Sequence, residues 1–152
     1  MIPYGKQHIT DEDIEAVIKV LKSEYLTGGP AVKEFEDTVK KFIGVKHAIA
    51  LSNATSGLHA ACLALDLKEG DIGITSPVTF LASANCIAYC GATPDFVDVD
   101  EETFCLSPSK LEEYIKKNGP PKVVIPVDFA GIPADLPEIW RLAKKYNFSV
   151  IE

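Results

Sequence analysis

The sequence lacks the features that mark secreted, membrane-spanning and nucleic-acid-binding chains. None of its apolar runs approaches the roughly 20 residues that cross a bilayer. Residues 1–7 also lack the basic and then apolar pattern of a signal peptide. Arginine occurs only at Arg141, and the formal net charge of -7 opposes a broad attraction to nucleic acid or anionic lipid. We therefore expect a soluble, cytoplasmic chain that binds neither nucleic acid nor membrane.

Two nucleotide-binding fingerprints and the usual metal-ligand spacing are also missing. No G-x-G-x-x-G motif follows an expected strand, which counts against a dinucleotide-binding Rossmann domain, and no G-x-x-x-x-G-K-[ST] motif marks a P-loop. The four cysteines form no C-x-x-C pair. Cys86 and Cys90 would share one helix face, which suits packing better than a metal cage. We expect buried, reduced thiols and no metal site.

The apolar content is sufficient for a packed core, since 47% of the 152 residues are hydrophobic. Residues 1–45 carry two amphipathic helical patterns. Thr10 and Asp13 predict a capping box at the start of the first helix, and the second is expected to end at Gly44. We interpret this region as an N-terminal helical segment.

From residue 46 onward, short apolar runs alternate with helical patterns. The expected strands lie at 47–51, 72–75, 93–99, 122–127 and 148–151, with helices at 54–67, 80–89, 108–117 and 136–146. Thr79 is expected to cap the helix at 80–89. This alternation predicts an α/β fold with a mostly parallel sheet and helices on both faces, in three layers. Ligands bind such sheets at the carboxyl ends of the strands. The chain stops at Glu152, at an expected strand end, which we interpret as a truncation.

One segment has the chemistry of a phosphate site. Residues 51–59 follow an expected strand and open a helix, whose N-terminus presents free N–H groups and a partial positive charge. Thr55 and Ser56 add hydroxyl donors, and Ala54 leaves room for close approach. Ser52, Asn53 and Thr55 equally suit a plain helix cap, and their spacing alone does not separate these two interpretations.

A series of short motifs runs along essentially the whole chain without large gaps. They are Tyr4, Leu26-Thr-Gly-Gly-Pro30, Phe35-Glu36, Gly44-Val-Lys-His47, Asn53-Ala-Thr-Ser56, Pro77-Val-Thr-Phe80, Ala82-Ser-Ala-Asn85, Gly91-Ala92 and Val127-Asp-Phe-Ala-Gly131. Their order and content resemble the DegT/DnrJ/EryC1/StrS sugar aminotransferases. The resemblance is closest to the subgroup that makes 4-amino-4,6-dideoxy sugars on UDP, as in the pseudaminic acid pathway.

The resemblance implies a fold, a cofactor and the residues that bind it. The fold would be the N-terminal part of the large domain of a fold-type I transferase that depends on pyridoxal 5'-phosphate (PLP). Residues 46–152 would form the first part of this PLP-binding domain, truncated at its C-terminal end. Ala54, Thr55 and Ser56 would hold the cofactor phosphate, Phe80 would stack on the ring, and Asp128 would face the cofactor edge. Spacing alone favours a first-turn core residue for Phe80, and a loop cap is the alternative for Asp128.

The resemblance also implies the substrates and the assembly. An amino acid, expected to be glutamate, would donate the amino group, and a nucleotide-linked keto-sugar would accept it. The full-length enzyme would be a homodimer, with the Leu26–Pro30 turn as a candidate for the shared active site. The positions that match nucleotide-sugar contacts in similar transaminases are Tyr4, Glu24, Tyr25, Leu26, Thr27 and Ala54.

The residues that perform the chemistry in this family are missing. Its Schiff-base lysine follows a serine by five residues, and no Ser-x-x-x-x-Lys occurs here. The aspartate that pairs with the pyridine nitrogen is expected just beyond Glu152. We therefore expect the full-length protein to be an aminotransferase and this chain to be inactive. Two alternatives remain: a sugar dehydratase of the same family with histidine in place of the lysine, and a non-catalytic phosphate-binding α/β domain.

Overall fold

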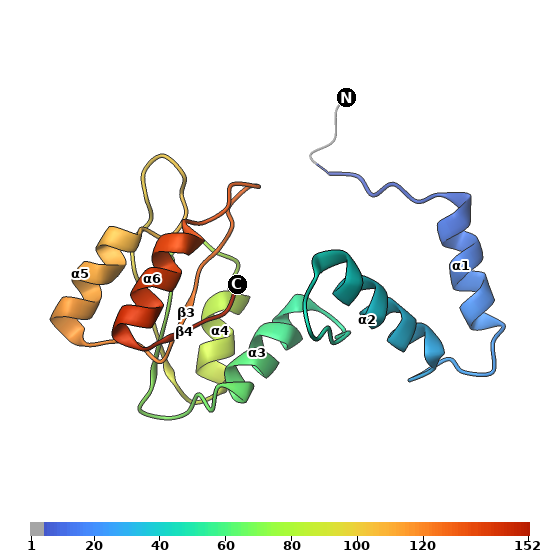
Figure 1. Ribbon diagram of the computed structural model, residues 1–152, viewed down its shortest axis with the longest axis horizontal. Helices are drawn as coiled ribbons and strands as arrows, with labels where there is room; N and C mark the ends of the chain where they lie inside the picture. The colour runs from blue at the N-terminus through green and yellow to red at the C-terminus, as the bar shows by residue number, and fades with distance from the viewer. Residues whose placement is uncertain (1–4) are drawn as a thin grey trace. The chain divides into compact units, whose positions relative to one another are not determined.

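The computed structural model describes residues 5–152, and the chain divides into two compact units, Met1–Ala50 and Leu51–Glu152. Figure 1 traces the order of the helices and strands in both. No helix in the described part of the chain is long and apolar enough to cross a membrane.

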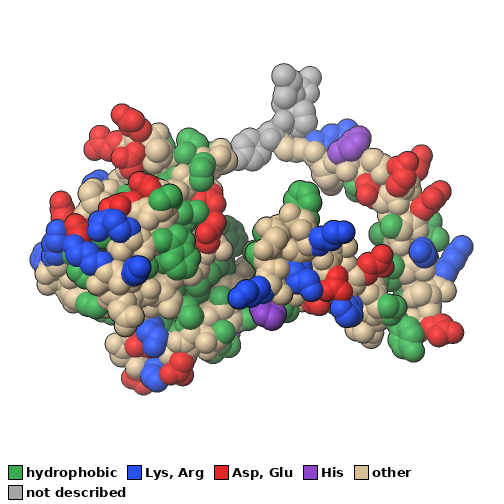
Figure 2. All heavy atoms as spheres, viewed as in Figure 1, with side chains coloured by type: hydrophobic (Ala, Val, Ile, Leu, Met, Phe, Trp, Pro, Cys, Tyr) green, Lys and Arg blue, Asp and Glu red, His purple; other side chains and the backbone are tan. Residues whose placement is uncertain are grey.

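The first unit contains α1 (Asp11–Leu21) and α2 (Pro30–Ile43). The expected capping box is confirmed: the Thr10 hydroxyl accepts the Asp13 N–H, and the Asp13 carboxylate accepts the Thr10 N–H at 2.8 Å. Gly44 ends α2 in the left-handed region at φ 79°, where a side chain would be strained. Neither helix buries a residue, so the apolar side chains of both remain at the surface of this unit (Figure 2).

The second unit is built on one parallel sheet. Its strands are β1 (Ile72–Thr75), β2 (Thr93–Phe96), β3 (Val123–Ile125) and β4 (Ser149–Val150), in the order β2-β1-β3-β4. Helix α3 (Ala54–Ala64) precedes β1, and α4 (Ala82–Tyr89), α5 (Pro108–Asn118) and α6 (Leu136–Tyr146) connect successive strands. Parallel neighbours require such crossover connections.

Alternation along the strands divides the core into two halves. Ile74 and Val124 pack against α5 and α6 on one face of the sheet. Val123 and Ile125 point the other way and pack against α3 and α4. The sheet therefore lies between two helical layers, as Figure 1 shows, and the expected three-layer α/β fold is confirmed.

The expected strand at 47–51 is wrong, because no strand is present there. A strand needs a neighbour for its ladder, and none of the strands in the described residues pairs with this segment. Its Ala50 N–H donates instead to the Glu36 carboxylate on α2, at 2.9 Å. The observed β2, β3 and β4 are also shorter than the expected runs at 93–99, 122–127 and 148–151, and α3 ends before residue 67.

The cysteines belong to the packing of the second unit. Cys62, Cys86 and Cys105 are buried free thiols, and Cys90 is half-buried. Burial raises the pKa of the Cys90 thiol. No group of three or more potential metal ligands occurs within residues 5–152. These side chains fill the core, as expected from their spacing.

Helix α4 approaches the backbone of β1 very closely at Gly73. A β-carbon on Gly73 would lie 2.7 Å from Ile87 Cδ1 and 2.8 Å from Ile87 Cγ1. Ile87 is fully buried in the core between the sheet and α3 and α4, so it has little room to move away. The absence of a side chain at Gly73 therefore sets the distance between α4 and the sheet.

We expect Gly73→Ala to lower the free energy of unfolding by about 1–3 kcal/mol, because the added methyl overpacks this contact. Urea unfolding followed by circular dichroism measures the loss. Adding Ile87→Val, which removes the nearest methyl, should recover part of it. Gly5→Ala is the matched control, since a β-carbon there meets nothing within 4 Å. Equal stability of Gly73→Ala and the wild type would contradict the close approach.

Glu112 connects α5 to α6 through Oε1, while its Oε2 bonds to Lys116 within α5. Oε1 accepts hydrogen bonds from Lys145 Nζ at 2.7 Å and from the Tyr146 hydroxyl at 3.0 Å. Oε2 accepts one from Lys116 Nζ at 2.9 Å. These donors, Lys145 foremost, lower the pKa of Glu112 from 4.5 to about 2.

A carboxyl whose pKa is lowered by folding stabilises the protein above its unfolded pKa, and this contribution is lost as pH falls through the folded pKa. We expect Glu112→Gln to lower the stability measured at neutral pH. The difference from wild type should shrink as pH falls from 4.5 toward about 2. Glu113→Gln is the control, because Glu113 lies on the same helix and its side chain makes no hydrogen bond to another described residue. A difference that stays constant over this pH range would argue against a stabilising role for the ionised Glu112 carboxylate.

Candidate functional site

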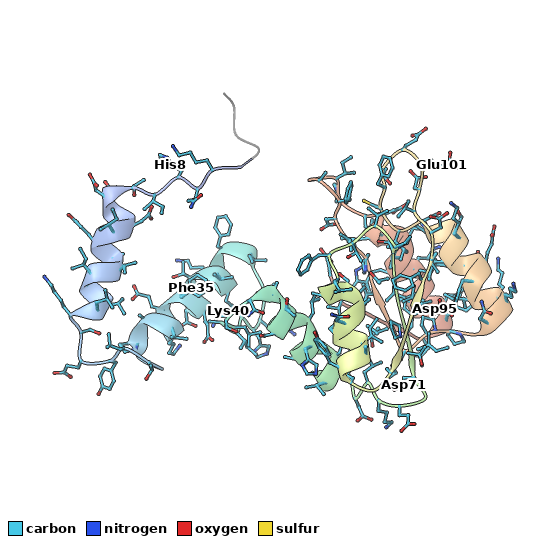
Figure 3. All side chains as sticks on the ribbon, turned by 180° about the vertical axis from the view of Figure 1, so that it is seen from behind. His8, Phe35, Lys40, Asp71, Asp95 and Glu101 are labelled. Carbon is cyan, nitrogen blue, oxygen red and sulfur yellow. The ribbon has the colours of Figure 1, made fainter. Side chains whose placement is uncertain are left out.

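The strand order places a topological switch point between β1 and β3. The chain leaves β1 for α4 on one face of the sheet, and it leaves β3 for α6 on the other. The two connecting loops, residues 76–81 and 126–135, therefore diverge at the carboxyl edge, which is where open α/β sheets bind ligands. Figure 3 marks the two edges: Asp71 precedes β1 at one end of this unit, and Glu101 follows β2 at the other.

Helix α3 also begins at the carboxyl edge. Gly91, just after α4, lies beside Glu69, just after α3: a β-carbon on Gly91 would be 3.7 Å from the Glu69 nitrogen. Both helices therefore end near the amino edge of the sheet, where the chain enters β1 and β2. Their N-termini consequently lie at the opposite edge, with the loops that carry Phe80 and Asp128.

The first turn of α3 contains both a cap and free donors. Asn53 is the N-cap, and its side-chain oxygen accepts the Ser56 N–H at 2.9 Å and the Ser56 hydroxyl at 3.1 Å. The N–H groups of Ala54 and Thr55, and the Thr55 hydroxyl, find no hydrogen-bond partner within residues 5–152. The cap interpretation therefore holds for Asn53, while Ala54 and Thr55 keep donors for a ligand.

Phe80 lies outside α4 and is 78% exposed. The expected helix cap at Thr79 is wrong: α4 begins at Ala82 with Leu81 as its N-cap, and the Thr79 hydroxyl donates to Ser83 Oγ at 2.8 Å. Phe80 is therefore not a first-turn core residue, which was the alternative drawn from its spacing. Its ring is available at the carboxyl edge for contact with another planar group.

Asp128 holds the loop that follows β3. Its Oδ1 accepts the Ala134 N–H at 2.8 Å, which closes the base of the loop. Within it, Ala130 at φ 51° and Gly131 at φ 84° form a tight turn in which the Ile132 N–H donates to the Phe129 carbonyl at 2.9 Å. Asp128 thus caps its loop, while its Oδ2 makes no hydrogen bond to another residue described.

The expected substrate contacts Glu24, Tyr25, Leu26 and Thr27 belong to the other unit, and the structure describes them separately from Ala54, Thr55, Ser56, Phe80 and Asp128. They are exposed in the loop between α1 and α2. This loop depends on Gly29, because a β-carbon there would lie 2.6 Å from Tyr25 Cβ. Tyr4 lies outside the described residues.

Glu36 is a residue to which the sequence patterns assigned no role. Its carboxylate is the acceptor for the Ala50 N–H, 14 residues further along the chain. The signal that could have identified it is its place beside Phe35 in the motif series, and the structure places it among the half-buried residues of α2. Figure 3 labels Phe35 and Lys40 on the same helix.

The chain matches one family of aminotransferases both by its family model and by its similarity to a curated protein. The model of the DegT/DnrJ/EryC1/StrS aminotransferase family matches residues 7–152. The UDP-4-amino-4,6-dideoxy-N-acetyl-beta-L-altrosamine transaminase of Campylobacter jejuni is 44% identical over 153 residues, which cover 100% of this chain and 40% of that protein.

Two solved structures share the fold over nearly the whole chain. The aminotransferase from Psychrobacter cryohalolentis matches with a TM-score of 0.89 and 36% identity, over 99% of this chain and 38% of that one. Helicobacter pylori PseC, an aminotransferase involved in the biosynthesis of pseudoaminic acid, matches with a TM-score of 0.90 and 32% identity, over 97% and 40%. The chain thus spans about 40% of the length of the curated transaminase it matches. On the family match over residues 7–152, the chain belongs to the DegT/DnrJ/EryC1/StrS aminotransferase family.

Proposed function

We propose that the chain is the N-terminal part of a PLP-dependent aminotransferase that delivers an amino group to a nucleotide-linked keto-sugar. Within it, this chain would supply the phosphate site of the cofactor. The observation that carries the proposal is the N-terminus of α3, which lies at the carboxyl edge of the sheet with free donors on Ala54 and Thr55. Membership of the aminotransferase family supports the reaction class.

The described residues fit PLP in two respects and lack a third. A phosphate at α3 would accept hydrogen bonds from the amides of Ala54 and Thr55 and from the Thr55 hydroxyl, and the helix N-terminus favours negative charge. The exposed ring of Phe80 suits stacking against a pyridine ring. Neither loop at the switch point, 76–81 or 126–135, contains a lysine. This edge would therefore bind the phosphate and the ring of the cofactor, but its two loops supply no amine for a covalent bond.

The residues of this chain would bind and orient the cofactor and would not transfer a proton. When bound, PLP supplies an electron sink for the carbanion at the substrate carbon. Thr55 and the α3 amides would fix the phosphate, with Ser56 held in place by Asn53. Phe80 would set the tilt of the ring. Asp128 would face the cofactor edge through its Oδ2, while its Oδ1 keeps the loop closed.

The substrate contacts and the assembly rest on the same proposal. Tyr4, Glu24, Tyr25, Leu26, Thr27 and Ala54 would contact the nucleotide-sugar, and glutamate would be the amino donor. The C. jejuni relative, whose name describes a transaminase of a UDP-linked dideoxy sugar, supports this substrate class. A homodimer would cover part of the apolar surface of α1 and α2, including Val17 and Phe35, which are 59% and 60% exposed.

Binding of PLP and of pyridoxal, which lacks the phosphate, tests the phosphate site. We expect the chain to bind PLP more tightly than pyridoxal in equilibrium dialysis. Thr55→Ala should weaken PLP binding by about tenfold, since a hydrogen bond to a charged group is lost, and should leave pyridoxal binding unchanged. Thr38→Ala on the exposed surface of α2 is the control. Equal affinity of the wild type for both compounds would contradict the site.

Borohydride reduction tests whether the chain can attach the cofactor. With PLP present, we expect no stable adduct at a unique lysine, because no lysine lies in the loops at the switch point. Peptide mass mapping after reduction measures this. A single lysine carrying most of the label would show that the chain supplies the amine itself.

The coding sequence after Glu152 tests the reaction class. We expect an aspartate within a few residues and then a Ser-x-x-x-x-Lys motif, which would supply the partner of the pyridine nitrogen and the missing amine. A histidine at the lysine position would indicate a dehydratase. A stop codon directly after Glu152 would contradict the proposal and favour a non-catalytic phosphate-binding domain.

A further inference from the structure

Thr75, the last residue of β1, joins the ends of three strands in the second unit. Its hydroxyl donates to the Ile125 carbonyl at the end of β3, at 2.8 Å and across 50 residues of sequence. Its own carbonyl accepts the Val97 N–H just after β2, at 3.1 Å. Thr75 is fully buried, and a buried hydroxyl without a partner is costly, so the bond to Ile125 is strongly favoured.

The hydroxyl bond lies at the point where β1 and β3 separate. The register pairs Thr75 with Ile125, and the loops 76–81 and 126–135 begin at the next residue of each strand. Within residues 5–152, no hydrogen bond joins one of these loops to the other. The Thr75 hydroxyl therefore connects the bases of both loops, and no bond further along them does so.

Each loop is also closed by a hydrogen bond of its own. Ser76, which is fully buried, donates from its hydroxyl to the Val78 carbonyl at 3.1 Å, two residues before Phe80. In the other loop, Asp128 Oδ1 accepts the Ala134 N–H at 2.8 Å. Because each loop is closed on itself and starts at a fixed strand end, a change in the spacing of β1 and β3 would move Phe80 relative to Asp128.

We propose that Thr75 is a positioning residue for the pyridine ring of PLP: its bond to Ile125 fixes the spacing of the two loops that carry Phe80 and Asp128. This inference rests on the proposed function. Thr75 is fully buried and acts through the loops that follow it and its partner, without touching the ring. The first turn of α3 belongs to neither loop. Loss of the Thr75 hydroxyl therefore weakens contacts to the ring and leaves phosphate recognition at α3 in place.

The test measures ring and phosphate recognition separately, by NMR titration of the isotope-labelled 152-residue chain. Pyridoxal, followed at the Phe80 amide, reports on the ring, and inorganic phosphate, followed at the Ala54 and Thr55 amides, reports on α3. Thr75→Val keeps the shape of the side chain without its hydroxyl. It should weaken pyridoxal binding by about fivefold, the effect expected for one neutral hydrogen bond, and leave phosphate binding unchanged. Thr75→Ser keeps the hydroxyl and should bind both probes as the wild type does.

A second pair of variants isolates the hydroxyl independently. Thr75→Ala and Thr75→Ser differ only in this group, so the alanine variant should bind pyridoxal more weakly than the serine variant and phosphate equally well. This pair carries the test if Thr75→Val fails to fold, as judged by circular dichroism. Thr93→Val is the control, because Thr93 is exposed at the start of β2 and its side chain makes no hydrogen bond to another described residue.

The outcomes separate this inference from the proposed function. If pyridoxal leaves Phe80 unmoved in the wild type, or phosphate leaves Ala54 and Thr55 unmoved, the proposed function is contradicted and this inference with it. If both probes bind as expected but Thr75→Val and Thr75→Ala bind pyridoxal like the wild type, the role of Thr75 alone is overturned. Equal weakening of pyridoxal and phosphate would also overturn it, since a general loss of structure does not discriminate between the two probes.

Discussion

The arrangement of the second unit follows from one constraint, the right-handed crossover between parallel strands. The chain pairs β2 on one side of β1 and β3 on the other, so α4 must cover one face while α5 and α6 cover the opposite one. That reversal opens the two loops at the carboxyl edge in opposite directions. The strand order therefore places Phe80 and Asp128 at the carboxyl edge, because each lies in one of these two loops.

Close packing on both faces of the sheet fixes the strands that end at this carboxyl edge. Gly73 lets α4 lie close against β1, with Ile87 filling the space that a side chain would occupy. On the other face, Glu112 joins α5 to α6 through Lys145 and Tyr146. Rigid layers on both faces fix the strand ends, and a ligand site built on such elements is positioned better than one built on mobile loops alone. Asn53 and Asp128 then use local hydrogen bonds to fix the turns that complete it.

The sequence predicted the fold class, the capping box at Thr10 and the resemblance to the family, because all three depend on local patterns. It failed at 47–51, where an apolar run resembles a strand but has no strand beside it in the described residues. It also placed the cap of α4 at Thr79, but the Thr79 hydroxyl donates to the Ser83 side chain and the helix begins at Ala82. The role of Glu36 could not be predicted from side-chain spacing, because its partner is the backbone N–H of Ala50, 14 residues away.

The central claim is that the first turn of α3 recognises a phosphate. The most direct test is a titration of the isotope-labelled chain with PLP, in which every backbone amide signal is followed by NMR. The account predicts the largest shifts at the amides of Ala54 and Thr55, with ring-current shifts at Phe80 that pyridoxal alone also produces. Shifts centred on the lysine-bearing surfaces of α2, α5 or α6, with Ala54 and Thr55 unmoved, would contradict it.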